Sequence, residues 1–355
     1  MNIEIDKITK FFDCGAVLTN ISIYIKSGEI VALLGPSGSG KTTLLRIIAG
    51  LESHSSGYLR FYGKDVSKLN ARDRSVGFVF QNYALFRHMT VLDNISFGMR
   101  VLPRHKRPNK QVINNKVMQL LNMVQLKHLA YRYPSQLSGG QKQRVALARS
   151  LAIEPKILLL DEPFGALDVQ VRKELRRWLR NLHHELKFTG VFVTHDQEEA
   201  MEVAHRVVIM NCGNIEQIGT PQDIWCMPAT RFVLKFLSEV NCVNGMVYGS
   251  KVFIGPYHWS LSYVPDVQGE IELFFRPWEM EIRKEFSICT PLPVKIVNVN
   301  LHGYYWQLSV EPLGWHCDLL TIILGVKDVF GVPKSGMYCY VSGQNARLYS
   351  GETIL

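Results

Sequence analysis

The feature that most constrains this 355-residue chain is the stretch Gly35-Pro36-Ser37-Gly38-Ser39-Gly40-Lys41-Thr42-Thr43. An apolar run, Ile30 to Leu34, precedes it, and a helical pattern that stops at Gly50 follows it. A strand, a glycine-rich turn and a helix in this order fit the phosphate-binding loop G-x-x-x-x-G-K-[ST]. Glycines let backbone N–H groups converge on phosphate oxygens, and the helix N-terminus adds a partial positive charge. A chance glycine turn before a helix is the alternative, and the complete match disfavours it.

Two side chains at the end of this loop have specific chemistry. Lys41 would reach the β- and γ-phosphates of a nucleotide, and the hydroxyl of Thr42 would hold Mg²⁺. The sequence therefore predicts a nucleotide site that uses Mg²⁺.

The length of 355 residues predicts about two domains, and a hydrophobic fraction of 47% is ample for packed cores. No apolar stretch approaches the roughly 20 residues that span a bilayer. The N-terminal MNIEIDKITK carries charges where a signal peptide needs an apolar region. The seven cysteines are scattered and include no C-x-x-C pair, which favours reduced thiols. We therefore expect a cytosolic protein.

The formal net charge of +9 could suggest a nucleic acid or an anionic surface as partner. The densest run of positive charge is Arg172 to Arg180, within the segment VRKELRRWLRNLHHEL. Apolar residues recur there at helical spacing, so we expect the arginines on the opposite, solvated face. Nucleic-acid binding is therefore not expected.

Two acids follow the apolar run Ile157 to Leu160, which is expected to be a buried strand. Asp161 suits the shell of Mg²⁺, because hard cations take oxygen ligands. Glu162 points elsewhere and suits a general base that polarises water. The alternative, that these acids only cap the next helix, is disfavoured by the phosphate loop upstream.

Two further polar residues follow apolar runs of the same kind. Gln81 comes directly after Gly77 to Phe80, and His195 comes directly after Val191 to Thr194. Ligands bind at the carboxyl ends of strands in a doubly wound sheet. Gln81 could coordinate Mg²⁺ and orient water, and His195 could contact the γ-phosphate. Each taken alone could equally be an ordinary polar or structural residue.

A second anion site is expected where Ser138, Gly139, Gly140 and Gln141 precede a helical stretch. It follows a segment from about residue 83 to 150 that has a helical pattern and basic loops, and we expect an inserted helical subdomain there. Upstream of the phosphate loop, Phe12 could stack on an adenine ring. A buried core phenylalanine is the alternative for Phe12.

These motifs together resemble the ATP-binding subunits of ABC transporters. The matching segments, in order, are GPSGSGKTT, Gln81, LSGGQ, LLLDE, FGALD and THD, and LSGGQ separates this family from other phosphate-loop NTPases. The resemblance covers about residues 1–235. It implies ATP hydrolysis with Mg²⁺ and a pair of copies that enclose two ATP molecules head to tail. Each ATP would lie between the phosphate loop of one copy and the LSGGQ signature of the other.

The resemblance assigns roles to single residues. Phe12 takes the adenine-stacking position, Gln81 the Q-loop, Asp168 the D-loop and His195 the switch position. The residues expected at ATP are Phe12, Gly35, Pro36, Ser37, Gly38, Ser39, Gly40, Lys41, Thr42, Thr43, Ser138, Gly139, Gly140, Gln141 and Asp168. Those expected at Mg²⁺ are Thr42, Gln81 and Asp161, and those expected in catalysis are Glu162, His195 and Gln81.

A finer resemblance is to the ATPase subunit of the bacterial sulfate/thiosulfate importer, through ALFRHMTVLDNISFG, PFGALDVQVRKELRRWLRNLHHEL and THDQEEAMEVA. It implies two membrane permease subunits as partners, a periplasmic solute-binding protein indirectly, and a peripheral location at the cytoplasmic face of the inner membrane. The alternative is an importer ATPase for molybdate, polyamine or sugar. A non-transport ABC ATPase is disfavoured, because the chain has neither long coiled-coil insertions nor a second phosphate loop.

The composition changes from about Asn241 onward. Short alternating segments with glycine and proline turns predict a small all-β, barrel-like domain. The segment Glu272 to Glu279, ELFFRPWE, resembles the regulatory domain of oligonucleotide-binding-fold type found on importer ATPases. The predicted fold class is α/β, with a phosphate-loop NTPase core over residues 1–237 and a C-terminal β domain over residues 238–355.

Overall fold

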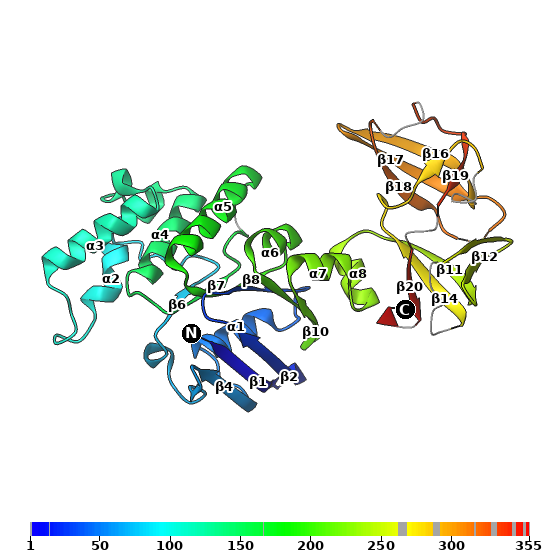
Figure 1. Ribbon diagram of the computed structural model, residues 1–355. Helices are drawn as coiled ribbons and strands as arrows, with labels where there is room; N and C mark the ends of the chain where they lie inside the picture. Colours follow the sequence, from blue (N-terminus) through cyan, green and yellow to red (C-terminus); the bar gives the residue numbers. More distant parts are fainter. Residues whose placement is uncertain are drawn as a thin grey trace. The chain divides into compact units, whose positions relative to one another are not determined.

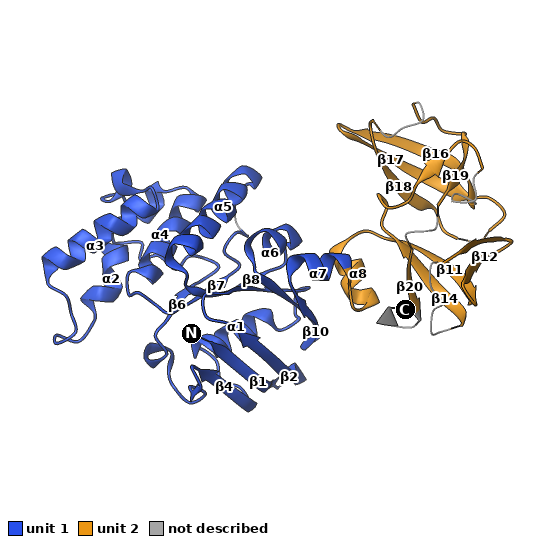
Figure 2. Ribbon diagram, viewed as in Figure 1, with its two compact units in different colours: residues 1–226 blue, residues 227–355 orange. Residues whose placement is uncertain are grey.

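The computed structural model describes residues 2–13, 15–165, 167–261, 268–286, 292–315, 317–327, 332–342, 346–350 and 353–354. The chain divides into two compact units, residues 1–226 and 227–355 (Figure 2). The division therefore falls after Cys226, whereas the predicted boundary followed residue 237. Of the cysteines and the FGALD motif named above, Cys14, Cys289 and Ala166 lie outside the described residues.

The first unit is built on a six-stranded sheet in the order β10-β9-β3-β8-β7-β6, in which all pairs are parallel except β10 with β9 (Figure 1). Its strands are β3 (Ile30–Leu34), β6 (Val76–Val79), β7 (Ile157–Asp161), β8 (Thr189–Thr194), β9 (Arg206–Asn211) and β10 (Asn214–Gly219). Every residue of β3, β7 and β8 is buried, as expected for parallel strands covered on both faces. The predicted α/β core is confirmed.

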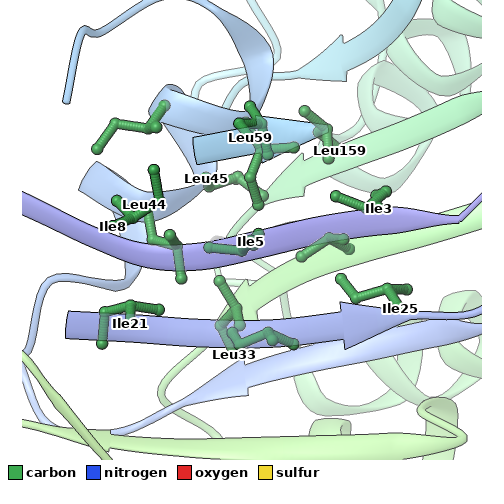
Figure 3. Packing of buried hydrophobic residues seen from close by; sticks show 14 of the residues in the cluster. Ile3, Ile5, Ile8, Ile21, Ile25, Leu33, Leu44, Leu45, Leu59 and Leu159 are labelled. Atoms are coloured by element: carbon green, nitrogen blue, oxygen red, sulfur yellow. The ribbon is translucent and has the colours of Figure 1, made fainter. Parts of the chain in front are cut away.

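A second, antiparallel sheet has the order β2-β1-β4-β5. Its strands are β1 (Ile3–Phe12), β2 (Gly15–Ile25), β4 (Ser56–Phe61) and β5 (Lys64–Asp65). The isoleucines of β1 and β2 pack with Leu44 and Leu45 of helix α1 (Lys41–Ala49) and with Leu33 of β3 in one buried cluster (Figure 3). This core holds the helix that follows the glycine loop in place.

The helices of the first unit follow the predicted pattern. The predicted helical subdomain contains α2 (Val91–Arg100), α3 (Lys110–Met123) and α4 (Gly139–Leu151). Further along lie α5 (Val169–Leu186), α6 (Gln197–Val203) and α7 (Pro221–Cys226), and the 3-10 turns are η1 (Ala71–Asp73), η2 (Lys127–Leu129) and η3 (Pro134–Gln136). In the described part of the chain, every helix is too short or too polar to cross a membrane.

Helix α5 corrects one expectation about the arginine-rich segment. The middle of its apolar stripe is buried as predicted, with Leu175 and Leu179 each 1% exposed, whereas Leu186 at its end is 43% exposed. Arg176, however, is 7% exposed, so it is not on a solvated face. Its Nε lies 2.7 Å from a carboxylate oxygen of Glu202, and its Nη2 lies 3.4 Å from Glu198 on α6. These acids compensate the buried guanidinium, because a buried charge requires a partner.

The second unit begins with α8 (Arg231–Leu237) and continues as two antiparallel sheets. One contains β11 (Asn241–Tyr248), β12 (Lys251–Ile254), β13 (Tyr257–Ser260), β14 (Gly269–Phe275), β20 (Arg347–Ser350) and β21 (Thr353–Ile354). The other contains β15 (Ile282–Arg283), β16 (Leu292–His302), β17 (Tyr305–Pro312), β18 (Leu320–Gly325) and β19 (Tyr338–Val341). The strands agree with the predicted all-β region.

Packing of α8 explains why the division falls after Cys226. Leu234 on α8 is fully buried in a cluster with Phe274 and Tyr349 of the β region. The hydroxyl of Tyr349 donates to the backbone carbonyl of Pro228 at 3.0 Å. Residues 227–237 therefore pack with the second unit.

Candidate nucleotide site

The candidate site lies at one edge of the six-stranded sheet. Strands β6, β7, β8 and β3 are consecutive neighbours and run parallel, so their carboxyl ends meet at that edge. Gln81 follows β6, Glu162 follows β7, His195 follows β8, and the loop that begins at Gly35 follows β3. Segments separated by more than a hundred residues are thereby brought together.

The loop requires glycine at two of its positions. Gly35 packs so closely that an added Cβ would lie 2.1 Å from the carbonyl oxygen of Met210. Gly40 has φ 93°, and its Cβ would lie 2.6 Å from Cδ2 of Leu18. Around Gly38, by contrast, an added Cβ would meet no atom within 4 Å, so the backbone there is open to a ligand. The loop thus combines a tightly packed base with an accessible tip, which fits a phosphate group.

Lys41 points back into this loop from the first turn of α1. Its Nζ donates to the carbonyl oxygens of Gly35 at 2.8 Å and Pro36 at 2.7 Å, and lies 3.3 Å from Oγ of Ser39. Only 6% of the residue is exposed. Burial lowers the pKa of the Lys41 ammonium, and the nearby carboxylate of Glu162 opposes that shift.

Thr42 and Asp161 form the contact expected of a cation site. The hydroxyl of Thr42 donates to Oδ1 of Asp161 at 3.2 Å. Asp161 is 5% exposed, and burial raises the pKa of its carboxyl group while the Thr42 hydroxyl lowers it. A hydroxyl and a carboxylate in contact are oxygen donors that suit Mg²⁺. The donor set therefore fits the predicted metal.

Glu162 is the point where three strand ends converge. Nε2 of Gln81 donates to its Oε2 at 2.7 Å, and Nδ1 of His195 lies 3.6 Å from its Oε1. Its backbone has φ 44°, in the left-handed region that non-glycine residues rarely adopt, and its N–H donates to the carbonyl of Val193 at 3.1 Å. Strained backbone of this kind is concentrated at functional sites. Among the described residues, the side-chain hydrogen bond of Gln81 is made to the carboxylate of Glu162.

The LSGGQ segment forms the start of α4. Oγ of Ser138 accepts from the N–H of Gln141 at 3.3 Å, and Oε1 of Gln141 accepts from the N–H of Ser138 at 2.9 Å. These reciprocal bonds are a capping box, which satisfies two otherwise unpaired backbone donors. Thr43 lies on α1 and Gly139 opens α4, both partly buried.

Asp168 begins α5 in a similar way, since its Oδ1 accepts from the N–H of Val171 at 3.0 Å. The starts of α4 and α5 pack tightly, because an added Cβ at Gly140 would lie 2.6 Å from Cγ1 of Val171. Among the described residues, no hydrogen bond or ion pair joins Ser138 or Asp168 to the phosphate loop or to Glu162. The signature and the D-loop thus form a separate cluster.

Phe12 ends β1 and is 44% exposed, so the alternative of a buried core phenylalanine is wrong. Nζ of Lys10 lies 4.6 Å from the centroid of its ring. The same ammonium pairs with Glu52 at 2.7 Å. An exposed aromatic face of this kind is compatible with ring stacking.

Arg149 on α4 is a positioning residue that the motif analysis missed. Its guanidinium donates to the carbonyl oxygens of Ala84 at 2.6 Å and Tyr83 at 2.9 Å, just beyond Gln81. Both carbonyl residues have positive φ, 46° and 62°. Burial lowers the pKa of Arg149. Arg149 therefore ties the signature helix to the segment that follows Gln81, and its signal in the sequence is a lone charge in the apolar run VALARSL.

Comparison with known proteins identifies the family. Residues 18–165 match the ABC transporter family. The sulfate/thiosulfate import ATP-binding protein CysA of Yersinia pseudotuberculosis serotype I (strain IP32953) is 64% identical over 355 residues, which are 100% of this chain and 98% of that protein. The protein of the same name from Escherichia coli (strain K12) is 61% identical over 352 residues, 99% of this chain and 96% of that protein.

Solved structures agree with this result over about three fifths of the chain. One match is a dimeric structure of the ATP-binding cassette MJ0796 in a post-hydrolysis state bound to ADP and Pi. Its sequence is 33% identical, the TM-score is 0.56, and the match covers 62% of this chain and 98% of that one. The protein cbiO1 from Clostridium perfringens, part of the ABC transporter complex cbiONQ, is 31% identical with a TM-score of 0.59, covering 63% of this chain and 90% of that one. The chain therefore belongs to the ABC transporter ATP-binding proteins, in the family of the sulfate/thiosulfate import ATP-binding proteins.

Proposed function

We propose that this chain is the ATP-hydrolysing subunit that energises an importer of sulfate or thiosulfate. The observation that carries the proposal is the 64% identity to a sulfate/thiosulfate import ATP-binding protein over the full length of both proteins. Similarity of this extent includes the second unit as well as the nucleotide-binding unit. Sulfate itself is handled by other subunits and does not bind this chain.

In this proposal the loop from Gly35 to Thr43 binds the phosphates of ATP, and Phe12 stacks on the adenine. Lys41 contributes a positive charge to the β- and γ-phosphates. Thr42, Asp161 and Gln81 hold Mg²⁺, which when bound would neutralise negative charge on the phosphates. Support for the cation site comes from the contact between Thr42 and Asp161.

Glu162 acts as the general base that polarises the attacking water. Its two carboxylate oxygens face Gln81 and His195, so both side chains can orient the carboxylate and the water. His195 also contacts the γ-phosphate and reports its presence. A positioned general base typically contributes about 10²–10⁴-fold to a rate.

Two copies of the chain enclose two ATP molecules head to tail. Ser138, Gly139, Gly140, Gln141 and Asp168 of one copy complete the site around the phosphate loop of the other. The separation of these residues from Lys41 and Glu162 within one chain supports this arrangement, as does the dimeric state of the related cassette.

The other partners are two membrane permease subunits, and a periplasmic solute-binding protein that acts through them. The chain is then peripheral, at the cytoplasmic face of the inner membrane. The second unit is a regulatory domain of oligonucleotide-binding-fold type, which meets the partner copy or a small regulator and no nucleic acid.

Uptake of labelled solute tests the proposal. Cells that lack this chain should lose energy-dependent uptake of labelled sulfate and thiosulfate, and Glu162→Gln should behave like the deletion. Uptake should return with the unmodified chain. Unimpaired sulfate and thiosulfate uptake, with loss of molybdate, polyamine or sugar uptake instead, would overturn the assigned solute.

A further inference from the structure

The first unit contains a cavity of about 570 Å³ at the edge of the central sheet opposite the nucleotide site. Lys156 and Thr189 line it, and they stand at the amino ends of β7 and β8. The same two strands end at Asp161 and Thr194, beside Glu162 and His195. A molecule in the cavity would therefore be separated from the nucleotide site by the length of these strands.

Part of the cavity lining, here called its floor, is apolar and comes from three different parts of the chain. Leu120 on α3, Leu151 at the end of α4 and Phe188 before β8 are 8%, 7% and 7% exposed. Tyr62, from the turn after β4, forms part of the wall. The volume lies within the range of about 300–1,000 Å³ that is common for small-molecule pockets. The cavity can therefore accommodate an apolar body of that size.

The cavity lining also contains an excess of basic residues. Lys116, Lys156 and Lys187 line the cavity, and Glu154 is the one acid among the described residues that do so. Glu154 neutralises only Lys116, at 2.6 Å. Nζ of Lys156 lies 5.6 Å from the centroid of the Tyr62 ring, at the wall of the cavity. An excess of two positive charges therefore surrounds an apolar floor.

We infer that this cavity binds a small amphipathic anion, with an aliphatic or aromatic body on the apolar floor and a carboxylate, phosphate or sulfonate group at Lys156 and Lys187. A neutral apolar molecule would gain nothing from the two positive charges, and a small inorganic anion would leave the floor unfilled. The site is distinct from the residues assigned to ATP.

The position of the cavity gives its occupant a route to the nucleotide site. Leu151 is the last residue of α4 and Leu186, which also lines the cavity, is the last residue of α5. The first residues of these helices are capped by Ser138 and Asp168. An occupant would contact both helices together with Phe188 of the core, and would hold the helical subdomain in one position relative to the sheet. We expect it to reduce hydrolysis.

The test uses the fluorescent probe 8-anilinonaphthalene-1-sulfonate, which joins an aromatic body to a sulfonate, and its uncharged analogue N-phenyl-1-naphthylamine. Binding to the full chain is measured by equilibrium dialysis. The informative variant is Lys156→Gln/Lys187→Gln, and the matched control is Lys106→Gln/Lys110→Gln, which removes one exposed lysine from the loop before α3 and one from the first position of α3.

The full chain should bind one sulfonate probe saturably, and loss of Lys156 and Lys187 should weaken that binding about tenfold. The control variant should bind normally, and the uncharged analogue should bind both variants alike. Three results would overturn the site. They are an absence of saturable binding, an equal loss of affinity in the control variant, and sulfonate binding that is unchanged in Lys156→Gln/Lys187→Gln.

Steady-state ATPase provides the second readout. Saturating sulfonate probe should lower the rate at least about twofold in the unmodified chain and the control, and should have a smaller effect in Lys156→Gln/Lys187→Gln. An unchanged rate at saturating, lysine-dependent binding would overturn the link to α4 and α5. An inactive unmodified chain that still binds the probe would count against the proposed ATPase function and not against the cavity.

Discussion

At the scale of single residues, Glu162 has the most constrained position in the nucleotide site. Its φ of 44° lies in the left-handed region, and its side chain has other partners than that of Asp161, although the two acids are adjacent in sequence. Asp161 consequently contacts Thr42, while Glu162 contacts Gln81 and lies near His195. One strand end thus supplies a metal-ligand candidate and a base candidate to different parts of the site.

Replacing this base should separate binding from hydrolysis. Glu162→Gln keeps the size of the side chain and an oxygen that can accept from Gln81, but it cannot accept a proton. We expect steady-state ATPase to fall about 10²–10⁴-fold, with ATP affinity retained. The matched control is Glu185→Gln, which alters an exposed acid on α5 and should leave the rate unchanged. ATPase near the unmodified rate would exclude Glu162 as the base.

A buried histidine predicts a pH effect on stability. His183 is 8% exposed and its Nε2 lies 3.0 Å from the carbonyl oxygen of Gly28. Burial lowers the pKa of His183, and nearby His205 lowers it further. The unfolded chain therefore takes up a proton at His183 more readily than the folded chain does. The folded state is thus fully stable above the ordinary histidine pKa and loses stability as the pH falls below that pKa.

We therefore expect the Tm of the unmodified chain to fall between about pH 7 and pH 5, and the fall to be shallower in His183→Gln. The control is His128→Gln, since that histidine is exposed. Thermal unfolding across this pH range measures the slopes. An equally steep fall in His183→Gln would show that His183 does not cause it.

At the scale of elements, the contact between α4 and α5 places the signature beside the D-loop. Gly140 on α4 faces Val171 on α5, and an added Cβ would lie 2.6 Å from its Cγ1. Alanine normally favours a helix over glycine by up to about 1 kcal/mol. Here overpacking, which typically costs about 1–3 kcal/mol, should exceed that gain.

Gly140→Ala should therefore lower the free energy of unfolding by about 1–2 kcal/mol and reduce ATPase. Shortening the facing side chain should relieve the clash. The free energy of unfolding of Gly140→Ala/Val171→Ala should therefore fall by less than the sum of the decreases in the two single variants. Val169→Ala on the same helix removes an 82% exposed valine and should give no such rescue. Chemical denaturation measures all of these variants. Strict additivity with Val171→Ala would contradict the close packing.

The hydrophobic periodicity of the sequence predicts where strands and helices lie, but it does not predict which side chains contact one another. The predicted strand Ile30 to Leu34 is β3, and the predicted run Ile157 to Leu160 is β7 with Asp161 added, because continuous apolar runs between turns are typical of buried parallel strands. Strand ends also predicted where Gln81 and His195 would lie. The pattern held no information on the left-handed backbone of Glu162, which depends on tertiary context.

Contacts between distant elements explain the places where the structure differs from what the sequence pattern indicates. The helical pattern of α5 placed Arg176 in solvent, because it could not show that Glu198 and Glu202 of α6 lie opposite. The boundary after residue 237 followed the change in composition, whereas Leu234 packs with Phe274 and Tyr349 far along the chain. Arg149 was missed for the same reason, since its partners are carbonyl oxygens of another segment.

At the scale of the whole molecule, the described residues include two groups of motif residues that no hydrogen bond or ion pair joins. Lys41, Glu162 and their neighbours form one group, and Ser138 with Asp168 forms the other. If one chain held a complete site, its signature would have to reach its own phosphate loop. If two chains share each site, the observed separation is what the assembly requires.

Mixing two inactive variants distinguishes these arrangements. Ser138→Arg keeps an intact phosphate loop, and Lys41→Ala keeps an intact signature. In a shared site, a mixed dimer contains one site formed by the loop of the first variant and the signature of the second, so the mixture should hydrolyse ATP faster than either variant alone. In a self-contained site every chain is defective, and mixing should restore nothing.

Two further mixtures make the result decisive. Unmodified chain mixed with Lys41→Ala also yields mixed dimers with one intact shared site, so its ATPase shows whether a single site turns over. Unmodified chain mixed with the double variant Ser138→Arg/Lys41→Ala yields mixed dimers with no intact shared site and should lose activity in proportion to the mixed dimers formed. Failure of the two single variants to complement each other, when the first mixture shows turnover by a single site, would contradict a site shared between copies.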